Sequence, residues 1–198
     1  GIAKMLNFAH GDVIMIGSYV VYFAFGASGL NPVLSIVLSM IVCTILGVVI
    51  ERLAYRPLRE APSLAVLITA IGVSYLLQQV AQLSWSSNPK SFTSVVSGMK
   101  PVSLFGGQLT ISAETIVTIV ACVVIMVVLM WFVNYPPAGH AMLAVSEDRG
   151  AAQLMGVNVN GTISLTFAIG SALAAIAGAL LCSSYPTLQP TTGAMPGI

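Results

Sequence analysis

Charged side chains are scarce in this chain of 198 residues, where they make up 7% of the sequence. A soluble domain carries about 25%. Hydrophobic residues make up 57%, and the mean hydropathy is +0.97. This composition excludes a disordered chain and almost any water-soluble enzyme, because so apolar a globule could not cover its surface with polar groups. The formal net charge of +1 offers no strong field to a polyanion such as a nucleic acid.

Residues for metal, redox or nucleophilic chemistry are equally few. His10 and His140 are the only histidines, and Asp12 and Asp148 the only aspartates, so an intramembrane protease or a metal site is disfavoured. The phosphate-binding pattern G-x-x-x-x-G-K-[ST] is absent, so no cofactor is expected in this chain and ATP would have to bind elsewhere. Three cysteines are interpreted as small hydrophobic filler: Cys43, Cys122 and Cys182.

Long charge-free intervals, at 13–50, 61–89, 115–146 and 150–198, organise the chain. A helix needs about 20 apolar residues to cross a bilayer, and helices satisfy every backbone polar group internally. We therefore predict an all-α protein, a polytopic transmembrane helix bundle forming a single domain over 1–198. Turn residues between Gly26 and Pro32 split the first interval. The predicted spans lie near 11–28, 33–50, 64–84, 114–133 and 162–183.

Lysine and arginine predict the orientation. If the connection at 51–63 is cytoplasmic, five basic residues lie inside and two, Lys90 and Lys100, lie outside. The five are Lys4, Arg52, Arg56, Arg59 and Arg149. Segment 85–113 is then an outer loop, and 134–161 is a long cytoplasmic loop.

Small residues recur every four positions in two spans, at Ser35, Ser39, Cys43 and Gly47 and at Gly170, Ala174, Gly178 and Cys182. Such rows let helix backbones approach closely in lipid. They are consistent with packing inside the chain or, alternatively, with a dimer seam.

A polar stretch, Asn7 to Asp12, directly precedes the first apolar span. Only 13 residues separate it from the Gly26 break, which makes a helix of about 20 Å, short of a full crossing. Either the helix begins earlier and carries these residues into the membrane, or it is a half-helix whose free N–H groups suit a carboxylate. The candidate substrate-pathway residues are Asn7, His10, Gly11 and Asp12. Alternatively, Asp12 caps its own helix at the membrane edge.

The basic stretch Glu51–Arg59 is interpreted as an anchor at the inner membrane face, with Tyr55 at the headgroup level. In the cytoplasmic loop, Pro136 and Pro137 stop the preceding span. A short helix is predicted from about Ala141 to Met155, ended by Gly156. Its small residues would let a partner's groove approach the backbone. A helix lying on the lipid is the alternative, which its single arginine disfavours.

Three stretches of this sequence resemble the LivH-type permease subunits of branched-chain amino acid ABC importers. They are Asn7–Asp12, Glu51–Arg59 with Leu67–Gly72, and Ala151-Ala152-x-x-x-Gly156 with Leu165–Gly178. The resemblance extends over essentially the whole chain and implies transport of hydrophobic, branched-chain amino acids by alternating access. It also implies that the chain is truncated at both ends and lies in the bacterial cytoplasmic membrane.

The resemblance further implies partners: a second homologous permease subunit, two ATP-binding subunits and an external substrate-binding protein. The ATP-binding subunits would dock on the cytoplasmic coupling helix. The candidate coupling residues are Glu147, Asp148, Ala151, Ala152 and Gly156. The sequence departs from the family pattern at Gly150, His140 and Leu143, which puts the strength of that docking in question.

An ion-coupled secondary transporter or channel without ATPase partners is the alternative function. Such a protein needs ionisable residues within its spans, and neither 13–50 nor 115–133 contains an Asp, Glu, Lys, Arg or His.

Overall fold

The computed structural model describes residues 9–59, 61–91, 94, 102–104 and 109–191. Its helices are α1 (Ala9–Val21), η1 (Tyr22–Ala27), α2 (Pro32–Ile50), η2 (Glu51–Tyr55), η3 (Arg56–Leu58), α3 (Ser63–Trp85), α4 (Ala113–Asn134), α5 (Pro137–Glu147), α6 (Arg149–Leu154) and α7 (Val159–Ser184). Four short strands are β1 (Lys90–Ser91), β2 (Val102–Leu104), β3 (Leu109–Ile111) and β4 (Thr187–Leu188).

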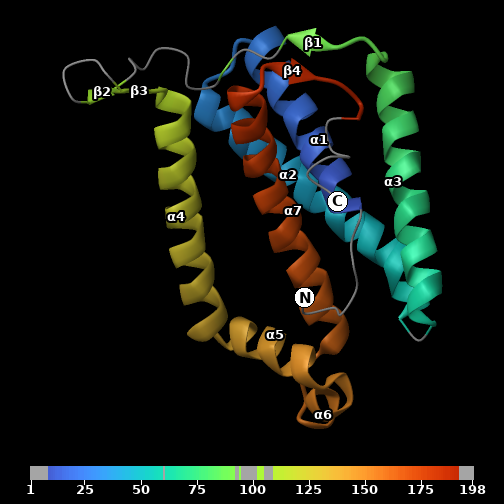
Figure 1. Cartoon of the computed structure of the whole chain (residues 1–198). Coiled ribbons are helices and arrows are strands. Elements are labelled where there is room, and N and C mark those ends of the chain that lie inside the picture. The colour runs from blue at the N-terminus through green and yellow to red at the C-terminus, as the bar shows by residue number, and fades with distance from the viewer. Residues whose placement is uncertain (1–8, 60, 92–93, 95–101, 105–108, 192–198) are drawn as a thin grey trace.

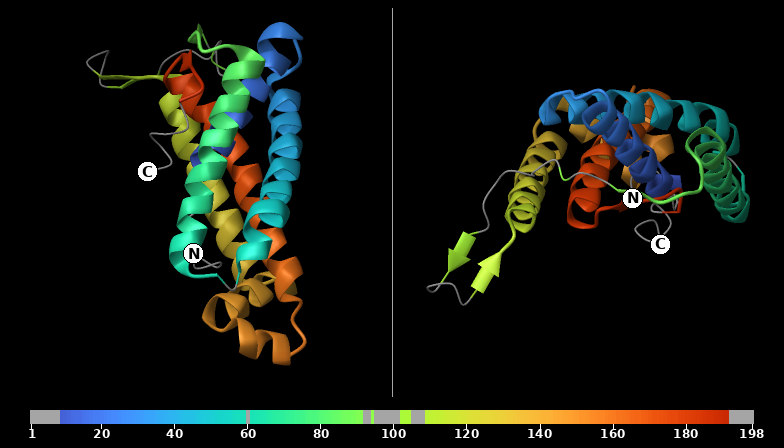
Figure 2. Two further views of the ribbon diagram at one scale, coloured as in Figure 1. Left: turned by 90° about the vertical axis from the view of Figure 1, so that its right-hand side faces the viewer. Right: turned by 90° about the horizontal axis from the view of Figure 1, so that it is seen from above.

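The long helices form one bundle, in which α2 crosses obliquely behind α1 and α7 and α4 stands at one edge (Figures 1 and 2). Within the described residues, four helical segments are long and apolar enough to cross a membrane: Pro32–Leu58, Leu64–Trp85, Ala113–Asn134 and Val159–Ser184. The predicted first span, near 11–28, is not among them. The predicted polytopic helix bundle is confirmed. α5, α6 and the α2–α3 connection lie at one end of the bundle (Figure 1). We call it the inner end, because the lysine and arginine distribution predicts that it is cytoplasmic.

At the opposite, outer end, two antiparallel strand pairs form where the sequence predicted only a loop. β1 pairs with β4, with Lys90 opposite Leu188, and β2 pairs with β3. The β1–β4 pair joins the segments that leave α3 and α7, which lie far apart in sequence. Such long-range pairing of two-residue strands leaves no periodic pattern, which is why the sequence did not predict it.

The first helix begins before Val13 and carries Asp12 inside it. Its 13 α-helical residues continue directly into the six residues of η1, so the shortfall of the predicted half-helix disappears. The helix stops before Gly29, whose φ of +64° favours glycine. Asn31 then caps α2 by accepting a hydrogen bond from the Val33 N–H at 3.2 Å. The described start of α1 lies about halfway up the bundle (Figure 1).

The rows of small residues pack α1, α2 and α7 against one another inside the chain. The Ser39 hydroxyl donates to the carbonyl of Gly17 at 2.8 Å, and the Cys43 thiol to that of Val13 at 3.7 Å. A Cβ added at Gly178 would lie 2.5 Å from the carbonyl oxygen of Ile14. These contacts agree with the intrachain interpretation of the rows.

The 134–161 loop contains two helices where the sequence predicted one helix from Ala141 to Met155, so that prediction is wrong. Asp148 is extended, with φ −145° and ψ 114°, and separates α5 from α6. Its carboxylate accepts the N–H groups of Gly150 at 2.8 Å and Ala151 at 3.1 Å. The Asp148 side chain therefore caps a new helix at this point, and the helix does not continue through it. Gly156 ends α6 as predicted, with φ +85°.

Candidate functional site

Asp12 is the central residue of the first candidate site. It is 1% exposed, and its carboxylate accepts hydrogen bonds from the Ser74 hydroxyl and from the side-chain amide of Gln78, the latter at 3.0 Å. Both donors belong to α3 and are themselves hydrogen-bonded at 3.3 Å. The carboxylate therefore bonds to side chains of a neighbouring helix. A capping aspartate would instead accept backbone N–H groups of its own helix, so this geometry argues against the capping alternative.

The depth of this site follows from its position in α3. Ser74 lies eleven residues from each end of the helix Ser63–Trp85, so the Asp12 carboxylate sits near the middle of a span. Within the described part of the chain, no Lys, Arg or His pairs with it. A carboxylate at such depth is costly unless it faces protein or water, and residues of this kind mark transport pathways by default.

The other predicted pathway residues are placed less decisively. His10 is half-buried and Gly11 is buried on the same first turn of α1. Asn7 lies outside the described residues. Ser74 and Gln78 were not among the predicted site residues. Their i, i+4 spacing in a largely apolar span places two polar groups on one helix face, and this was the signal that could have identified them.

The predicted coupling residues divide between structure and surface. Ala152 is 4% exposed and packs with Val145 and Ile163, so it holds the loop against the start of α7. Asp148 caps α6, while Ala151 and Gly156 are exposed. Glu147 is exposed at the end of α5.

Leu154 and Met155, which were not among the predicted coupling residues, are large apolar side chains at the exposed tip of this loop. Leu154 is 90% exposed and Met155 84% exposed. Apolar side chains with such exposure at the end of a short helix are typical of contact residues for a partner protein. The signal in the sequence was present, because both directly precede the helix-ending glycine.

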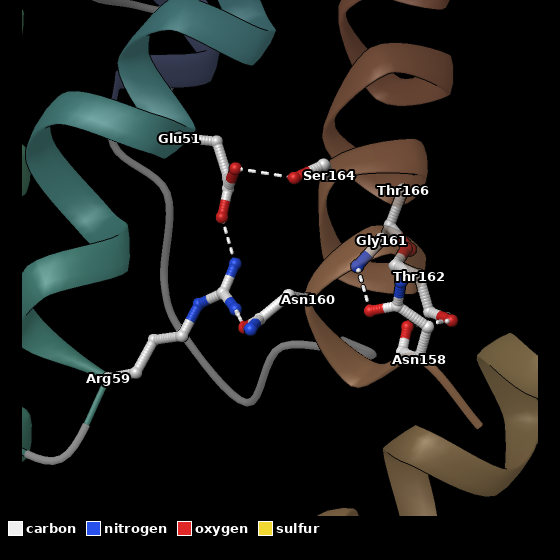
Figure 3. Close-up of polar contacts among 8 residues, drawn as sticks. All are labelled: Glu51, Arg59, Asn158, Asn160, Gly161, Thr162, Ser164 and Thr166. Carbon is white, nitrogen blue, oxygen red and sulfur yellow. Dashed lines mark hydrogen bonds and ion pairs between the residues drawn. The ribbon is translucent and has the colours of Figure 1, made fainter. Parts of the chain in front are cut away.

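A polar cluster around the buried carboxylate of Glu51 links the segment that follows α2 to the start of α7 at the inner end (Figure 3). Glu51 is fully buried and forms an ion pair with Arg59. The Ser164 hydroxyl donates to the second oxygen of Glu51 at 2.6 Å, and Arg59 also donates to the side chain of Asn160. We call these four residues the clasp: Glu51, Arg59, Asn160 and Ser164.

The interpretation of Glu51–Arg59 as a simple anchor therefore needs correction. Glu51 and Arg59 face protein, and Tyr55 is 1% exposed with its ring 5.4 Å from that of Phe167. The physical reason is the helical continuation through η2, which turns this face of the segment toward α7. Arg52 and Arg56 remain exposed, as the anchor interpretation requires.

A bundle of apolar helices, with a carboxylate buried at half depth and two short helices at one end, defines a multi-pass membrane protein. The chain belongs to the family described as branched-chain amino acid transport system permease components, which matches residues 1–198. This family is the one that the sequence motifs resemble, and its members have a transport role.

Curated relatives agree with this assignment. The chain is 39% identical over 210 residues to the high-affinity branched-chain amino acid transport system permease protein BraD of Pseudomonas aeruginosa. It is 37% identical over 209 residues to the corresponding LivH of Salmonella typhimurium. Each alignment includes the whole chain and 67% of the relative. A probable LivH of Methanocaldococcus jannaschii is 29% identical over 201 residues, covering 94% of this chain and 59% of that protein. No solved structure matches the chain.

Proposed function

We propose that this chain is the membrane-spanning permease subunit of an ATP-driven importer for branched-chain, hydrophobic amino acids. It would lie in the bacterial cytoplasmic membrane beside a second, homologous permease subunit. Two ATP-binding subunits would dock at the inner end, and an external binding protein would deliver the substrate at the outer end. The chain itself would catalyse no chemical reaction.

The observation that carries the transport proposal is the Asp12 carboxylate at half depth. An amino acid crosses the membrane as a zwitterion, and its ammonium group needs a counter-charge once it leaves water. Asp12 supplies that charge, while Ser74 and Gln78 fix its orientation. His10 and Gly11 precede it on the same turn and would line the route with Asn7.

Coupling to ATP hydrolysis would run through packed side chains. Ala152 of α6 and Val145 of α5 contact Ile163 at the start of α7. α7 in turn packs along α1, where Gly178 lies against Ile14 and Ser18. A push on α5 and α6 would therefore shift α7 as a rigid rod and alter the packing of the helix that bears Asp12, which is the basis of alternating access.

Asp12→Asn tests the pathway role. The substitution keeps the size of the side chain and removes its charge, so we expect ATP-driven uptake of leucine, isoleucine and valine to fall at least about tenfold. Uptake is measured in proteoliposomes that hold the assembled transporter, with Ser74→Ala as a second variant that leaves the charge in place and disturbs its orientation.

Glu114→Gln is the matched control, because it removes a carboxylate from the first turn of α4, away from α1 and α3. We expect this control to transport normally. Unchanged affinity and rate in Asp12→Asn would assign Asp12 a structural role only. Uptake that persists without ATP would contradict the proposed importer and favour a secondary transporter.

Leu154→Gln with Met155→Gln tests the coupling surface. Because both side chains are almost fully exposed, the thermal stability of the permease should hardly change. Loss of two apolar anchors from an interface should weaken binding of the ATP-binding subunits at least about tenfold. Co-purification and surface plasmon resonance measure this effect.

Ala152→Trp provides the contrast, since Ala152 packs inside the loop. We expect Ala152→Trp to lower both the stability of the permease and the binding of its partners. Full partner binding by the Leu154 and Met155 double variant would remove these residues from the docking surface.

A further inference from the structure

A cavity lies at the inner end, between the α2–η2–η3 segment and the first half of α7. Its volume is about 600 Å³. Arg52 and Arg56 line one wall, and Asn160 and Ser164 line the opposite wall. The cavity is open to the surface of the bundle and does not include Asp12 or the exposed tip of the coupling loop.

Among the described residues, the charged side chains that line this cavity are both basic: Arg52 and Arg56. Within the described residues, neither Arg52 nor Arg56 has an acidic partner, because Glu51 is already engaged by Arg59 and Ser164. Asn160, which lines the cavity, uses its side-chain oxygen for Arg59 and keeps its amide N–H₂ group as a possible donor. Two guanidinium groups and an amide donor suit an anion with several oxygens, above all a phosphate.

A second, apolar cavity lies in line with the first along α2 and α7, and we call the two cavities together the α2–α7 groove. Val48, Leu165 and Ala168 form the apolar part of the first cavity. One helical turn farther along both helices, a second cavity of about 380 Å³ is lined by α2 and by Ala172 of α7, with almost no polar surface. Val37 is its most distant lining residue, 15 residues from Arg52, which corresponds to about 22 Å of helix.

We propose that the α2–α7 groove binds an anionic phospholipid of the inner leaflet. Arg52 and Arg56 hold its phosphate at the membrane surface, and an acyl chain lies along the groove past Val48 toward Val37. The length of the groove along α2, about 22 Å, exceeds the hydrocarbon depth of one leaflet, about 15 Å, so the groove is long enough for one acyl chain. Basic cavities between helices on the cytoplasmic side of a membrane are typical sites for anionic headgroups.

The bound lipid would bridge two segments that lie far apart in the sequence. One wall of the cavity follows α2, and the other is the start of α7, where the coupling loop ends. The lipid would therefore reinforce the clasp from outside. This inference goes beyond the proposed transport function and does not depend on it, because it concerns lipid binding alone.

Native mass spectrometry of the purified full-length permease, with the subunits that co-purify with it, tests the site. The probes are dioleoylphosphatidylglycerol and dioleoylphosphatidylcholine. We expect phosphatidylglycerol to be retained about tenfold more strongly than phosphatidylcholine, and Arg52→Gln with Arg56→Gln to abolish that preference. Lys90→Gln is the matched control, because it removes a positive charge at the outer end and should leave the preference intact.

A second variant separates the lipid from a free phosphate. Ala168→Phe fills the apolar groove, so we expect it to weaken phosphatidylglycerol binding while leaving binding of soluble glycerol phosphate unchanged. Glycerol phosphate bound as tightly as phosphatidylglycerol by the unsubstituted protein would overturn the lipid assignment. Equal retention of both lipids, or an unchanged preference in the double arginine variant, would overturn the site itself.

Discussion

Arg59→Gln should lower the thermal unfolding midpoint of the permease in mild detergent by about 10 °C. The substitution leaves the fully buried carboxylate of Glu51 without a cation, and removal of one partner from a buried ion pair costs about 3–5 kcal/mol. It also breaks the hydrogen bond to Asn160, so only the bond between Ser164 and Glu51 still links this segment to the start of α7 (Figure 3).

The double variant Glu51→Gln with Arg59→Gln is the control for charge. It removes both charges at once, so no uncompensated carboxylate remains in the protein interior. We expect it to recover at least half of the stability that Arg59→Gln loses. Equal losses in the single and double variants would show that packing of the Arg59 side chain, and not the charge of Glu51, is what matters.

Gly178→Ala should also lower the thermal unfolding midpoint, because Gly178 lies where α1 and α7 cross. The added Cβ would lie 2.5 Å from the backbone oxygen of Ile14 and 2.6 Å from the Ser18 hydroxyl. Because the first of these atoms belongs to a helix backbone, the two helices must move apart. Overpacking of this kind costs about 1–3 kcal/mol. The readouts are the unfolding midpoint and the monodisperse fraction after size-exclusion chromatography.

Gly170→Ala is the matched control on the same helix. A Cβ there would meet nothing within 4 Å, and alanine is favoured over glycine in a helix by up to about 1 kcal/mol. We therefore expect Gly170→Ala to keep or slightly raise the unfolding midpoint. A loss in Gly170→Ala as large as that in Gly178→Ala would mean that glycine at 178 is not needed for close approach.

Much of the architecture could be predicted because a bilayer imposes simple rules. Scarce charge, apolar segments of about 20 residues and an excess of basic residues on one side predict a helical bundle and its orientation. The turn near Gly29 and Asn31 and the helix end at Gly156 follow from local backbone preferences, and the structure has both. The family resemblance likewise depended on short contiguous motifs.

The candidate sites could be predicted only in part. Asp12 stood out because a carboxylate beside an apolar span is unusual, but its partners Ser74 and Gln78 lie more than 60 residues away. The predicted coupling residues all belong to the 134–161 loop, but Asp148 breaks the helix that the sequence predicted as continuous. Which alanine faces inward and which side chains face outward depends on how that short helix packs.

The sequence by itself determined the solvent of this protein, its class as a bundle of long apolar helices, and the family to which it belongs. Composition and contiguous motifs carry that information. Only the tertiary structure decided that Glu51 and Arg59 form a buried clasp, that Ala152 packs inward while Leu154 and Met155 face outward, and that α2 and α7 enclose a basic groove. These features depend on contacts between residues far apart in the chain, which helical periodicity cannot specify when a span is apolar on every face.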